Sequence, residues 1–492
     1  MLPGPELLQE IINHGDKTST SIIDGDYSFT YGQLGEKITN LASYLVHEYN
    51  IQKGERVILY LPNNWKFVVA FYAVLKAGGV VVPIDFRSSK RELDYISGNT
   101  EASIQFIDEI KRDSASDSCR GTIIVSRSPH LYGSSDCFED PEITPEDTAV
   151  IFFTGGTTGF SKGVPLSHRN IMHILSGLSG MLGLKYGKET FVQFLPMTHS
   201  GGMNCSMNTS LYNAGKTIIM GKFDPMVLLD IIEQQKVSVV IGVPTVYSSL
   251  VRSTDIRNRD LSSVKIFFLS GDKVQENVAN EFKMATGKTI VVGWGLTEAS
   301  PQLSVAPLGI FKENYVGKPL PGTEIVTVDG EGNVLPTSSI GILAVKGPQV
   351  MSGYWRNDEK NLKIFTSGGY LLTGDTGYVR EDGVYLLGRA KDVIISGGYK
   401  IWRTEVENTI MEHECVRETA VIGINDPIYG ETVKAFIVSN CEITKDDIVA
   451  FCRARLSAYK VPRIIEFRPE LPKSSIGKIL HRVLEQENAS RD

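Results

Sequence analysis

Short apolar runs that alternate with helical segments constrain the fold of this chain more than any other feature. Residues 56–61 are apolar and β-branched, residues 65–75 are apolar on nearly every side, and residues 79–84 form a second β-rich run. Strands separated by buried helices favour parallel sheets with crossover helices. Apolar runs at 237–243 and 265–269 repeat the pattern. We therefore expect an α/β fold with mostly parallel sheets.

Capping residues predict where several helices begin. Thr30 is a candidate N-cap after a short strand, and Asp224 precedes a proline at the first position of a helix that runs to about Gln235. The pattern of residues 168–184 is also helical. These helices fit the crossover connections that parallel strands require.

A change of texture along the chain predicts the domain organisation. From residue 318 to about 388, short alternating strands rich in glycine and proline replace the helices. A new α+β pattern follows, with expected helices at 405–413 and 445–456. We expect a large N-terminal domain, residues 1–388, with a β-rich subdomain at about 318–388. A small α+β C-terminal domain should cover residues 392–492.

Composition excludes several classes of protein. The 492 residues are 42% hydrophobic, which is enough for a sizeable core, and the net charge of −7 argues against nucleic acid as a partner. No stretch approaches ~20 uninterrupted apolar residues, so no membrane span is expected. The first residues lack the basic and apolar regions of a secretory signal.

Six scattered cysteines contain no Cys-x-x-Cys pair, and we expect all of them to be free thiols in a reducing cytoplasm. Cys415 lies two residues from His413, but a single pair without further ligands does not predict a metal site.

A glycine-rich loop follows the apolar run at 149–153 and carries one lysine, Lys162. Glycines let the backbone approach a ligand closely, and the N–H groups of such a loop form an anion-binding concavity. The physical interpretation is a phosphate cradle, and the alternative is a plain surface loop between a strand and a helix. A Walker A loop is excluded, because the required spacing of glycine and lysine is absent. The remaining members of the proposed cradle are Thr154, Gly155, Gly156, Thr157, Thr158, Gly159 and Ser161.

Polar residues also follow other predicted strands. Ser270-Gly271-Asp272 comes after the run at 265–269, and Gly293-Trp294-Gly295-Leu296-Thr297-Glu298 comes after the run at 289–292. Ligands of open α/β sheets collect beyond the carboxyl ends of strands, so we expect one shared cleft. The Trp294 ring is suited to lie flat against a purine, and Glu298 is suited to hold Mg²⁺. A tight structural turn is an equally good interpretation of this second stretch taken alone.

The glycine-rich loop resembles the signature loop of the adenylate-forming superfamily, which includes acyl-CoA synthetases, peptide-synthetase adenylation domains and luciferases. Gly155 replaces a serine and Ser161 replaces a proline of the usual pattern. Five further stretches resemble motifs of the same superfamily and occur in its order, so coincidence is very improbable. They are residues 293–298, 372–375, 388–392, 396–401 and 472–478.

The resemblance implies roles for individual residues. Lys478 would be the catalytic lysine, His199 would gate the carboxylate pocket, and Glu298 would bind the metal. Residues 389–391 would form a hinge with Lys391 as its pivot, and Asp375 would accept hydrogen bonds from both ribose hydroxyls. The CoA-binding residues would be Gly397, Gly398, Tyr399 and Trp402. The ATP- or AMP-binding residues would be Thr154, Gly155, Gly156, Thr157, Thr158, Gly159, Lys162, Ser270, Gly271, Asp272, Gly293, Trp294, Gly295, Thr297, Asp375, Arg389 and Lys478.

The resemblance further implies a ligase that uses ATP, Mg²⁺ and CoA, forms an acyl-adenylate with release of pyrophosphate, and then forms an acyl-CoA thioester. The stretches around His199 and Glu298 look most like those of enzymes for fatty or medium-chain acids. An aryl-acid CoA ligase and transfer to a carrier protein are the alternatives within this class. An amino-acid substrate is disfavoured, since no Asp stands beside the pocket strand. Outside the class, the departures at Gly155 and Ser161 motivate a non-catalytic nucleotide-binding regulator, and a luciferase-like oxygenase also remains open.

Overall fold

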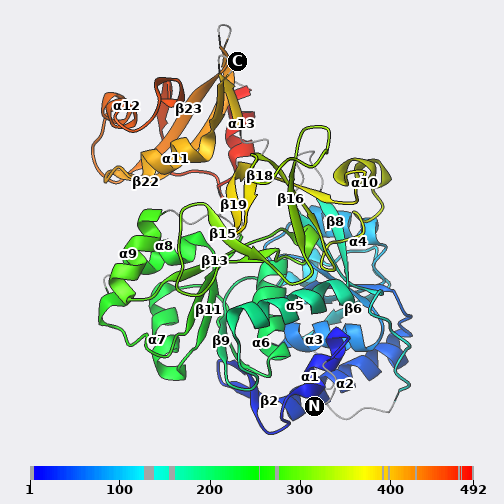
Figure 1. Cartoon of the computed structure of the whole chain (residues 1–492). Helices are drawn as coiled ribbons and strands as arrows, with labels where there is room; N and C mark the ends of the chain where they lie inside the picture. Colours follow the sequence, from blue (N-terminus) through cyan, green and yellow to red (C-terminus); the bar gives the residue numbers. More distant parts are fainter. Residues whose placement is uncertain are drawn as a thin grey trace. The chain divides into compact units, whose positions relative to one another are not determined.

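The computed structural model consists of two compact units (Figure 1). It describes residues 5–126, 138–154, 161–253, 255–271, 276–389, 393–396, 399–426, 429–474, 477 and 479–489, with the backbone alone at 393, 395, 399, 400, 402 and 430. The N-terminal unit comprises Met1–Val274, Val278–Glu324 and Val345–Leu371. The C-terminal unit comprises Gln275–Asn277, Ile325–Ala344 and Leu372–Asp492.

A parallel run of strands forms one sheet of the N-terminal unit. Its spatial order is β13-β12-β11-β9-β10-β1, with antiparallel β2 beyond β1 and antiparallel β14 and β15 beyond β13. In Figure 1, α7, α8 and α9 lie to the left of β9 and β11, and α5 and α6 lie to their right. The strands are β1 (Thr20–Asp24), β2 (Tyr27–Thr30), β9 (Thr190–Gln193), β10 (Lys216–Ile219), β11 (Val239–Gly242), β12 (Ile266–Leu269), β13 (Ile290–Trp294), β14 (Ser304–Val305) and β15 (Tyr315–Pro319).

A second sheet of the same unit has the order β6-β5-β3-β4-β7-β8, parallel except for the β7–β8 pair. Its strands are β3 (Arg56–Tyr60), β4 (Val80–Pro83), β5 (Ile104–Ile107), β6 (Gly121–Ile124), β7 (Thr148–Thr154) and β8 (Lys162–Ser167). The helices of the unit are α1 (Ile11–His14), α2 (Tyr31–Tyr49), α3 (Trp65–Lys76), α4 (Lys90–Thr100), α5 (His168–Leu182), α6 (Thr209–Tyr212), α7 (Pro225–Gln235), α8 (Pro244–Arg252), α9 (Glu276–Thr286) and α10 (Asp358–Ile364).

Local sequence signals account for several of these helices. The Thr30 hydroxyl accepts the Gln33 N–H, and the Gln33 side chain accepts the Thr30 N–H, which together form a capping box at the start of α2. Asp224 caps α7 in front of Pro225, as the sequence predicts. Helix α3 is buried at ten of its twelve residues, which confirms the expectation of a helix that is apolar nearly all round.

The C-terminal unit contains a β18–β19 hairpin and a five-stranded sheet of order β21-β20-β23-β22, in which β24 also pairs with β23. One apolar cluster, including Val406, Val421 and Ile448, packs the helices Arg403–Met411 and Lys445–Arg453 against this sheet. The strands are β18 (Leu371–Arg380), β19 (Gly383–Arg389), β20 (Val393–Ser396), β21 (Tyr399–Trp402), β22 (Val416–Asp426), β23 (Gly430–Ser439) and β24 (Ile464–Phe467). The helices are α11 (Arg403–Met411), α12 (Lys445–Arg453) and α13 (His481–Ala489), and two further strands, β16 (Glu324–Val328) and β17 (Gly341–Lys346), connect the two units along the chain.

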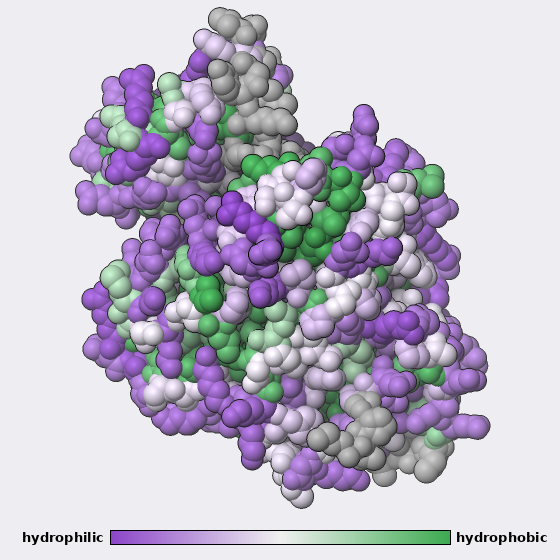
Figure 2. All heavy atoms as spheres, in the orientation of Figure 1, coloured by the Kyte–Doolittle hydropathy of each residue, from purple (hydrophilic) through white to green (hydrophobic). Residues whose placement is uncertain are grey.

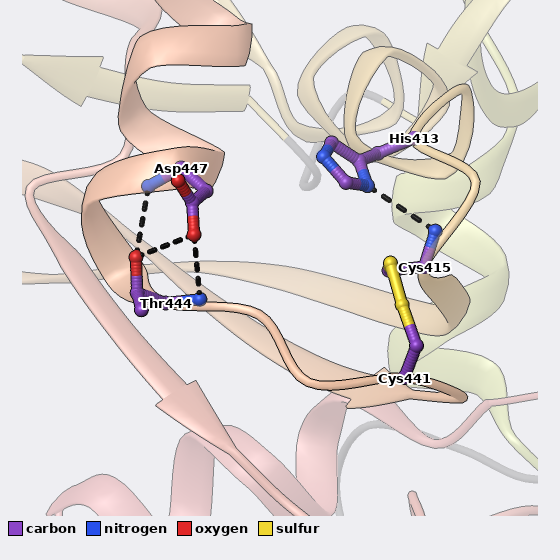
Figure 3. The surroundings of a disulfide bond; sticks show 5 residues. All are labelled: His413, Cys415, Cys441, Thr444 and Asp447. Carbon is purple, nitrogen blue, oxygen red and sulfur yellow. Dashed lines mark hydrogen bonds between the residues drawn. A yellow bond between two sulfur atoms is a disulfide. The ribbon is translucent and has the colours of Figure 1, made fainter.

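The prediction that every cysteine is a free thiol is wrong for two of them, because Cys415 and Cys441 form a disulfide (Figure 3). Antiparallel pairing of β22 with β23 places Val416 opposite Ser439, and the Asn440 N–H then donates to the Cys415 carbonyl over 2.9 Å. Cys441, the next residue, therefore lies close to Cys415, with a Cα–Cα distance of 5.2 Å. The His413 ring accepts a hydrogen bond from the Cys415 N–H over 3.2 Å. Among the described residues, Cys119, Cys205 and Cys452 are free thiols.

Hydrophilic residues cover most of the face of the chain that is drawn in Figure 2. Within the part of the chain that the structure describes, no helix combines the length and the apolar character needed to cross a bilayer.

Candidate active site

The glycine-rich loop connects two strands of one hairpin. Thr154 ends β7 and pairs with Lys162, which begins β8, so residues 155–160 form the connection between them. Helix α5 begins only at His168, so the glycine-rich segment joins two strands and does not lead directly into a helix. The cradle residues Gly155, Gly156, Thr157, Thr158 and Gly159 lie outside the described residues.

Three side chains from distant parts of the sequence meet beside this hairpin: Lys162, Tyr354 and Glu298. The Lys162 ammonium lies 4.5 Å from the centre of the Tyr354 ring and donates a hydrogen bond of 3.4 Å to the phenol oxygen. The phenol donates a hydrogen bond of 2.7 Å to Oε1 of Glu298. We call this set the lysine–tyrosine–glutamate cluster.

Burial controls the protonation of the cluster. It lowers the pKa of the Lys162 ammonium, as does the Lys360 charge, while Glu298 partly opposes both. Burial also raises the pKa of the Tyr354 phenol, and the adjacent Glu298 carboxylate raises it further. The phenol therefore keeps its proton at neutral pH and is available as a donor to Glu298.

The Glu298 carboxylate fits a magnesium ion that takes most of its ligands from phosphates and water. Glu298 lies in a short 3-10 turn, Thr297–Ala299, and its carbonyl accepts the Met351 N–H over 2.9 Å. The described residues contain no group of three or more His, Cys, Asp or Glu side chains that could hold a metal. Mg²⁺ is commonly bound in this way, by one or two carboxylates together with substrate phosphates.

The glycines on either side of Trp294 are explained by close packing. A Cβ at Gly293 would lie 2.3 Å from the Gln302 amide nitrogen, and a Cβ at Gly295 would lie 1.8 Å from the Pro301 carbonyl oxygen. Trp294 is the last residue of β13 and is only 5% exposed. Close packing therefore gives a structural reason for both glycines, with Gly293 inside strand β13 and Gly295 directly after it. It does not exclude a nucleotide beside them.

Two other predicted residues, Thr297 and Ser270, form side-chain hydrogen bonds within the N-terminal unit. The hydroxyls of Ser200 and Thr297 lie 3.0 Å apart, and the Ser270 hydroxyl donates to the Gln302 side chain over 3.1 Å. Gly271, which follows Ser270, has a φ of 95°. Asp272 lies outside the described residues.

His199 faces a carboxylate that the sequence analysis did not identify. Its Nε2 lies 3.7 Å from Oδ2 of Asp85, and Arg87 donates to the same carboxylate from Nε over 3.0 Å and from Nη2 over 2.9 Å. Burial alone would raise the pKa of Asp85, but the His199 ring and the bonds from Arg87 outweigh burial and hold this pKa well below its ordinary range. Asp85 thus remains ionised next to the His199 ring.

Asp375 and Arg389 form a second predicted pair, within the C-terminal unit. They lie opposite each other on β18 and β19, with Nε of Arg389 at 3.5 Å from Oδ1 of Asp375. Asp375 is 8% exposed, and its N–H donates to the Thr373 hydroxyl over 3.0 Å. The pair presents a carboxylate and a guanidinium together, the two groups that the resemblance assigns to ribose and phosphate.

The remaining predicted residues lie on strand β21 or outside the described residues. Tyr399 and Trp402 are the first and last residues of strand β21, and each is described by its backbone alone. Lys391, Gly397, Gly398 and Lys478 lie outside the described residues. Their assigned roles therefore stay predictions.

Sequence reasoning missed Asp85 and Tyr354. Asp85 follows the predicted strand at 79–84, and the position of polar residues at strand ends was a usable signal for it. Tyr354 stands in a long connection between β17 and α10, where no local pattern marks it. Only the three-dimensional contact with Glu298 identifies it.

Two family matches cover most of the chain. Residues 10–355 match the family described as AMP-binding enzyme, and residues 405–478 match the AMP-binding enzyme C-terminal domain. The first match alone spans more than half of the 492 residues.

Individual relatives agree with these matches. A long-chain-fatty-acid–CoA ligase of Bacillus subtilis (strain 168) is 34% identical over 518 residues, covering 96% of this chain and 92% of that protein. ATP-bound MatB from Rhodopseudomonas palustris superposes with a TM-score of 0.93 at 28% identity over 98% of both chains. The anthranilate CoA ligase AuaEII, in complex with anthranoyl-AMP, gives 0.90 at 25% identity over 99% of this chain and 98% of that one. The resemblance to adenylate-forming enzymes and the predicted fold class are thereby confirmed, and the chain is an enzyme of the AMP-binding family.

Proposed function

We propose that this enzyme is an AMP-forming acid–CoA ligase and that its acid is a fatty or medium-chain acid. The observation that carries the proposal is the lysine–tyrosine–glutamate cluster, which holds an ammonium and a carboxylate on one phenol. The ammonium suits the phosphates of ATP, and the carboxylate suits their magnesium ion. The 34% sequence identity to a long-chain-fatty-acid–CoA ligase over 96% of this chain supports a fatty or medium-chain acid as the substrate.

In the first half-reaction, a carboxylate oxygen of the acid attacks the α-phosphorus of ATP in line. The bond from that phosphorus to the pyrophosphate oxygen breaks, and pyrophosphate leaves. Lys162 would offset charge that develops on the leaving phosphates, and Glu298 would hold Mg²⁺, which supplies positive charge there when bound. Positioning and electrostatics carry most of the catalysis in such a transfer.

In the second half-reaction, the CoA sulfur attacks the acyl carbon of the adenylate, the thiol proton passes to solvent, and AMP leaves. We propose that residues 1–388 and 392–492 act as two domains joined by the hinge at 389–391, with Lys391 as the pivot. Lys478 would serve the first half-reaction. Gly397, Gly398, Tyr399 and Trp402 would line the passage for CoA. The support is the resemblance of these stretches to the family's motifs.

The Lys478→Ala variant tests the division of labour. We expect it to abolish adenylate formation and to spare thioester formation from a preformed adenylate, because the ammonium acts on the α-phosphate and the acid carboxylate. Lys473→Ala is the matched control, since the Lys473 ammonium is already paired with Glu418 over 2.8 Å. Equal loss of both half-reactions in Lys478→Ala would refute the assignment.

The class of acid is tested by a pyrophosphate-release screen with fatty, aryl and amino acids, with and without CoA. We expect release with fatty or medium-chain acids and a thioester only when CoA is present. A response to aryl acids alone would favour the alternative that the anthranilate CoA ligase represents. Thioester formation on a carrier protein but not on CoA would change the acceptor. Failure of every acid would favour the nucleotide-binding regulator.

We also propose that the enzyme works in the cytoplasm, where both ATP and CoA are supplied. The argument from free thiols no longer supports this location, given the Cys415–Cys441 bond. Recovery of the enzyme in the soluble fraction of lysed cells checks it, and recovery outside the cell would contradict it.

A further inference from the structure

The phenol of Tyr354 joins the two charged groups of the lysine–tyrosine–glutamate cluster without itself carrying charge. Its single proton is directed at Glu298 over 2.7 Å, and its oxygen accepts from Lys162 over 3.4 Å. Among the described residues, no ion pair joins Lys162 directly to Glu298. The phenol therefore occupies the place where an ammonium and a carboxylate would otherwise meet.

The backbone around Tyr354 is fixed from several directions. Its N–H donates to the Asn361 side chain over 2.7 Å, and the Asn361 amide donates back to its carbonyl over 3.0 Å. The next residue, Trp355, donates its N–H to the Gly163 carbonyl over 2.8 Å. A Cβ at Gly163 would lie 2.9 Å from the Cβ of Trp355, so glycine permits this approach. The Tyr354 segment is thus tied directly to the residue after Lys162.

The same segment is tied to the other end of the cluster. Met351 donates its N–H to the Glu298 carbonyl over 2.9 Å, and Asn170 donates to the Pro348 carbonyl over 2.7 Å. Arg356 forms a bidentate ion pair with Glu101, with both distances 2.7 Å. A side chain held by these contacts returns to one place without reordering, which is the condition for preorganised electrostatics.

We propose that Tyr354 is a positioning residue that keeps Lys162 and Glu298 apart, so that the ammonium faces the phosphates and the carboxylate faces the magnesium ion. The inference rests on the proposed function of these two residues. Tyr354 acts through Lys162 and Glu298 and makes no bond to substrate. Without the phenol proton, Glu298 turns to Lys162, and the two charges neutralise each other where both are required.

Tyr354→Phe is the informative variant, because it keeps the ring beneath the Lys162 ammonium and removes only the hydroxyl. An alanine would instead open the cluster toward the neighbouring cavity of about 570 Å³, which Tyr354, Ser352 and Asn361 help to line. Loss of a hydrogen bond to a charged group corresponds to a change of about 10- to 100-fold in a binding constant. We expect Tyr354→Phe to raise the magnesium concentration for half-maximal ATP–pyrophosphate exchange by about tenfold or more. Thioester formation from preformed adenylate should be unchanged.

Tyr370→Phe is the matched control. Tyr370 donates to Glu324 over 2.6 Å in the same unit, but this exposed pair does not contact the cluster. The Tyr370→Phe variant should show the magnesium dependence and the ATP–pyrophosphate exchange rate of the wild type. The double variant Tyr354→Phe with Glu298→Gln should exchange ATP and pyrophosphate as fast as Glu298→Gln alone, because the phenol acts through that carboxylate.

Calorimetric titration of magnesium pyrophosphate into each variant gives a readout that needs no turnover. We expect about tenfold weaker binding for Tyr354→Phe and unchanged binding for Tyr370→Phe, with both variants melting like the wild type. Unchanged binding and magnesium dependence in Tyr354→Phe would overturn the inference, as would equal loss in both half-reactions. If the wild type binds magnesium pyrophosphate with this pattern but activates no acid, the proposed function fails and the inference stands.

Discussion

The lysine–tyrosine–glutamate cluster and the Asp375–Arg389 pair are built in different ways. The lysine–tyrosine–glutamate cluster draws its residues from β8, a 3-10 turn and the connection before α10, and Tyr354 follows Lys162 at a sequence separation of 192. The Asp375–Arg389 pair lies across two consecutive strands of one hairpin. The first depends on the packing of a whole unit, and the second depends only on hairpin register. Substitutions elsewhere in the packed unit should therefore disturb the geometry of the cluster far more than that of the Asp375–Arg389 pair.

The largest expected effect is on the cluster itself. Glu298→Ala should lower the rate of ATP–pyrophosphate exchange by about 10²- to 10³-fold, since it removes the carboxylate proposed to hold magnesium at the leaving phosphates. Glu324→Ala, which breaks the exposed Tyr370–Glu324 pair, is the control and should keep the wild-type rate. Exchange is followed with labelled pyrophosphate at saturating ATP. A Glu298→Ala enzyme with wild-type exchange would remove the cluster from the site.

A smaller effect separates the stabilities of the two units. The Cys415–Cys441 bond closes a sequence separation of 26 residues, for which the chain-entropy account gives about 3.5 kcal/mol. Cys415→Ser or a reductant should lower the melting temperature of the C-terminal unit and leave that of the N-terminal unit unchanged. Differential scanning calorimetry measures both. Two extra reactive thiols in denatured, non-reduced wild type would show that the bond is absent.

A pH effect of about 2 kcal/mol probes the N-terminal unit. His168 is 2% exposed, and its Nδ1 accepts the Leu8 N–H over 3.2 Å. Burial lowers its pKa to about 4, with Asp147 partly opposing. The unfolded chain, with a histidine pKa of ~6.5, binds the proton more readily. The stability that the neutral His168 contributes is therefore fully present above pH ~6.5, the unfolded pKa, and is lost as the pH falls toward 4.

Urea unfolding at pH 7.5 and pH 5 measures this loss. We expect about 2 kcal/mol less loss in His168→Gln than in the wild type over the same interval, from the shift above. His47→Gln replaces an exposed histidine and should behave like the wild type. Identical pH slopes in His168→Gln and wild type would show that this side chain is not held neutral.

The smallest effect concerns the hairpin pair. Asp375→Asn should raise the KM for ATP by roughly tenfold, because the charge-assisted hydrogen bond proposed between the Asp375 carboxylate and the ribose is lost. The melting temperatures of both units should be unchanged, since the pair is local. A large loss of stability in Asp375→Asn would contradict the view that hairpin register alone holds this pair.

The same contrast explains what the sequence could predict. Helix starts at Thr30 and Asp224 and the buried helix α3 depend on neighbouring residues, and all three were predicted. Cys415 and Cys441 were wrongly predicted to be free thiols, because the register of β22 with β23 brings them together and no spacing rule reveals that register. Tyr354 was missed for the same reason, since its partners are distant in sequence.

Glu298, by contrast, was found through its motif before any contact was known. Motif resemblance could name individual residues of the site. It could not supply the phenol between the two charges, which only the packed unit shows.

The fate of ATP tests the central claim most directly. The enzyme is incubated with a fatty acid, ATP, Mg²⁺ and CoA, and the nucleotide products are separated by chromatography. The account predicts AMP and pyrophosphate in equal amounts with acyl-CoA, all dependent on the acid. ADP and inorganic phosphate as the products would contradict it.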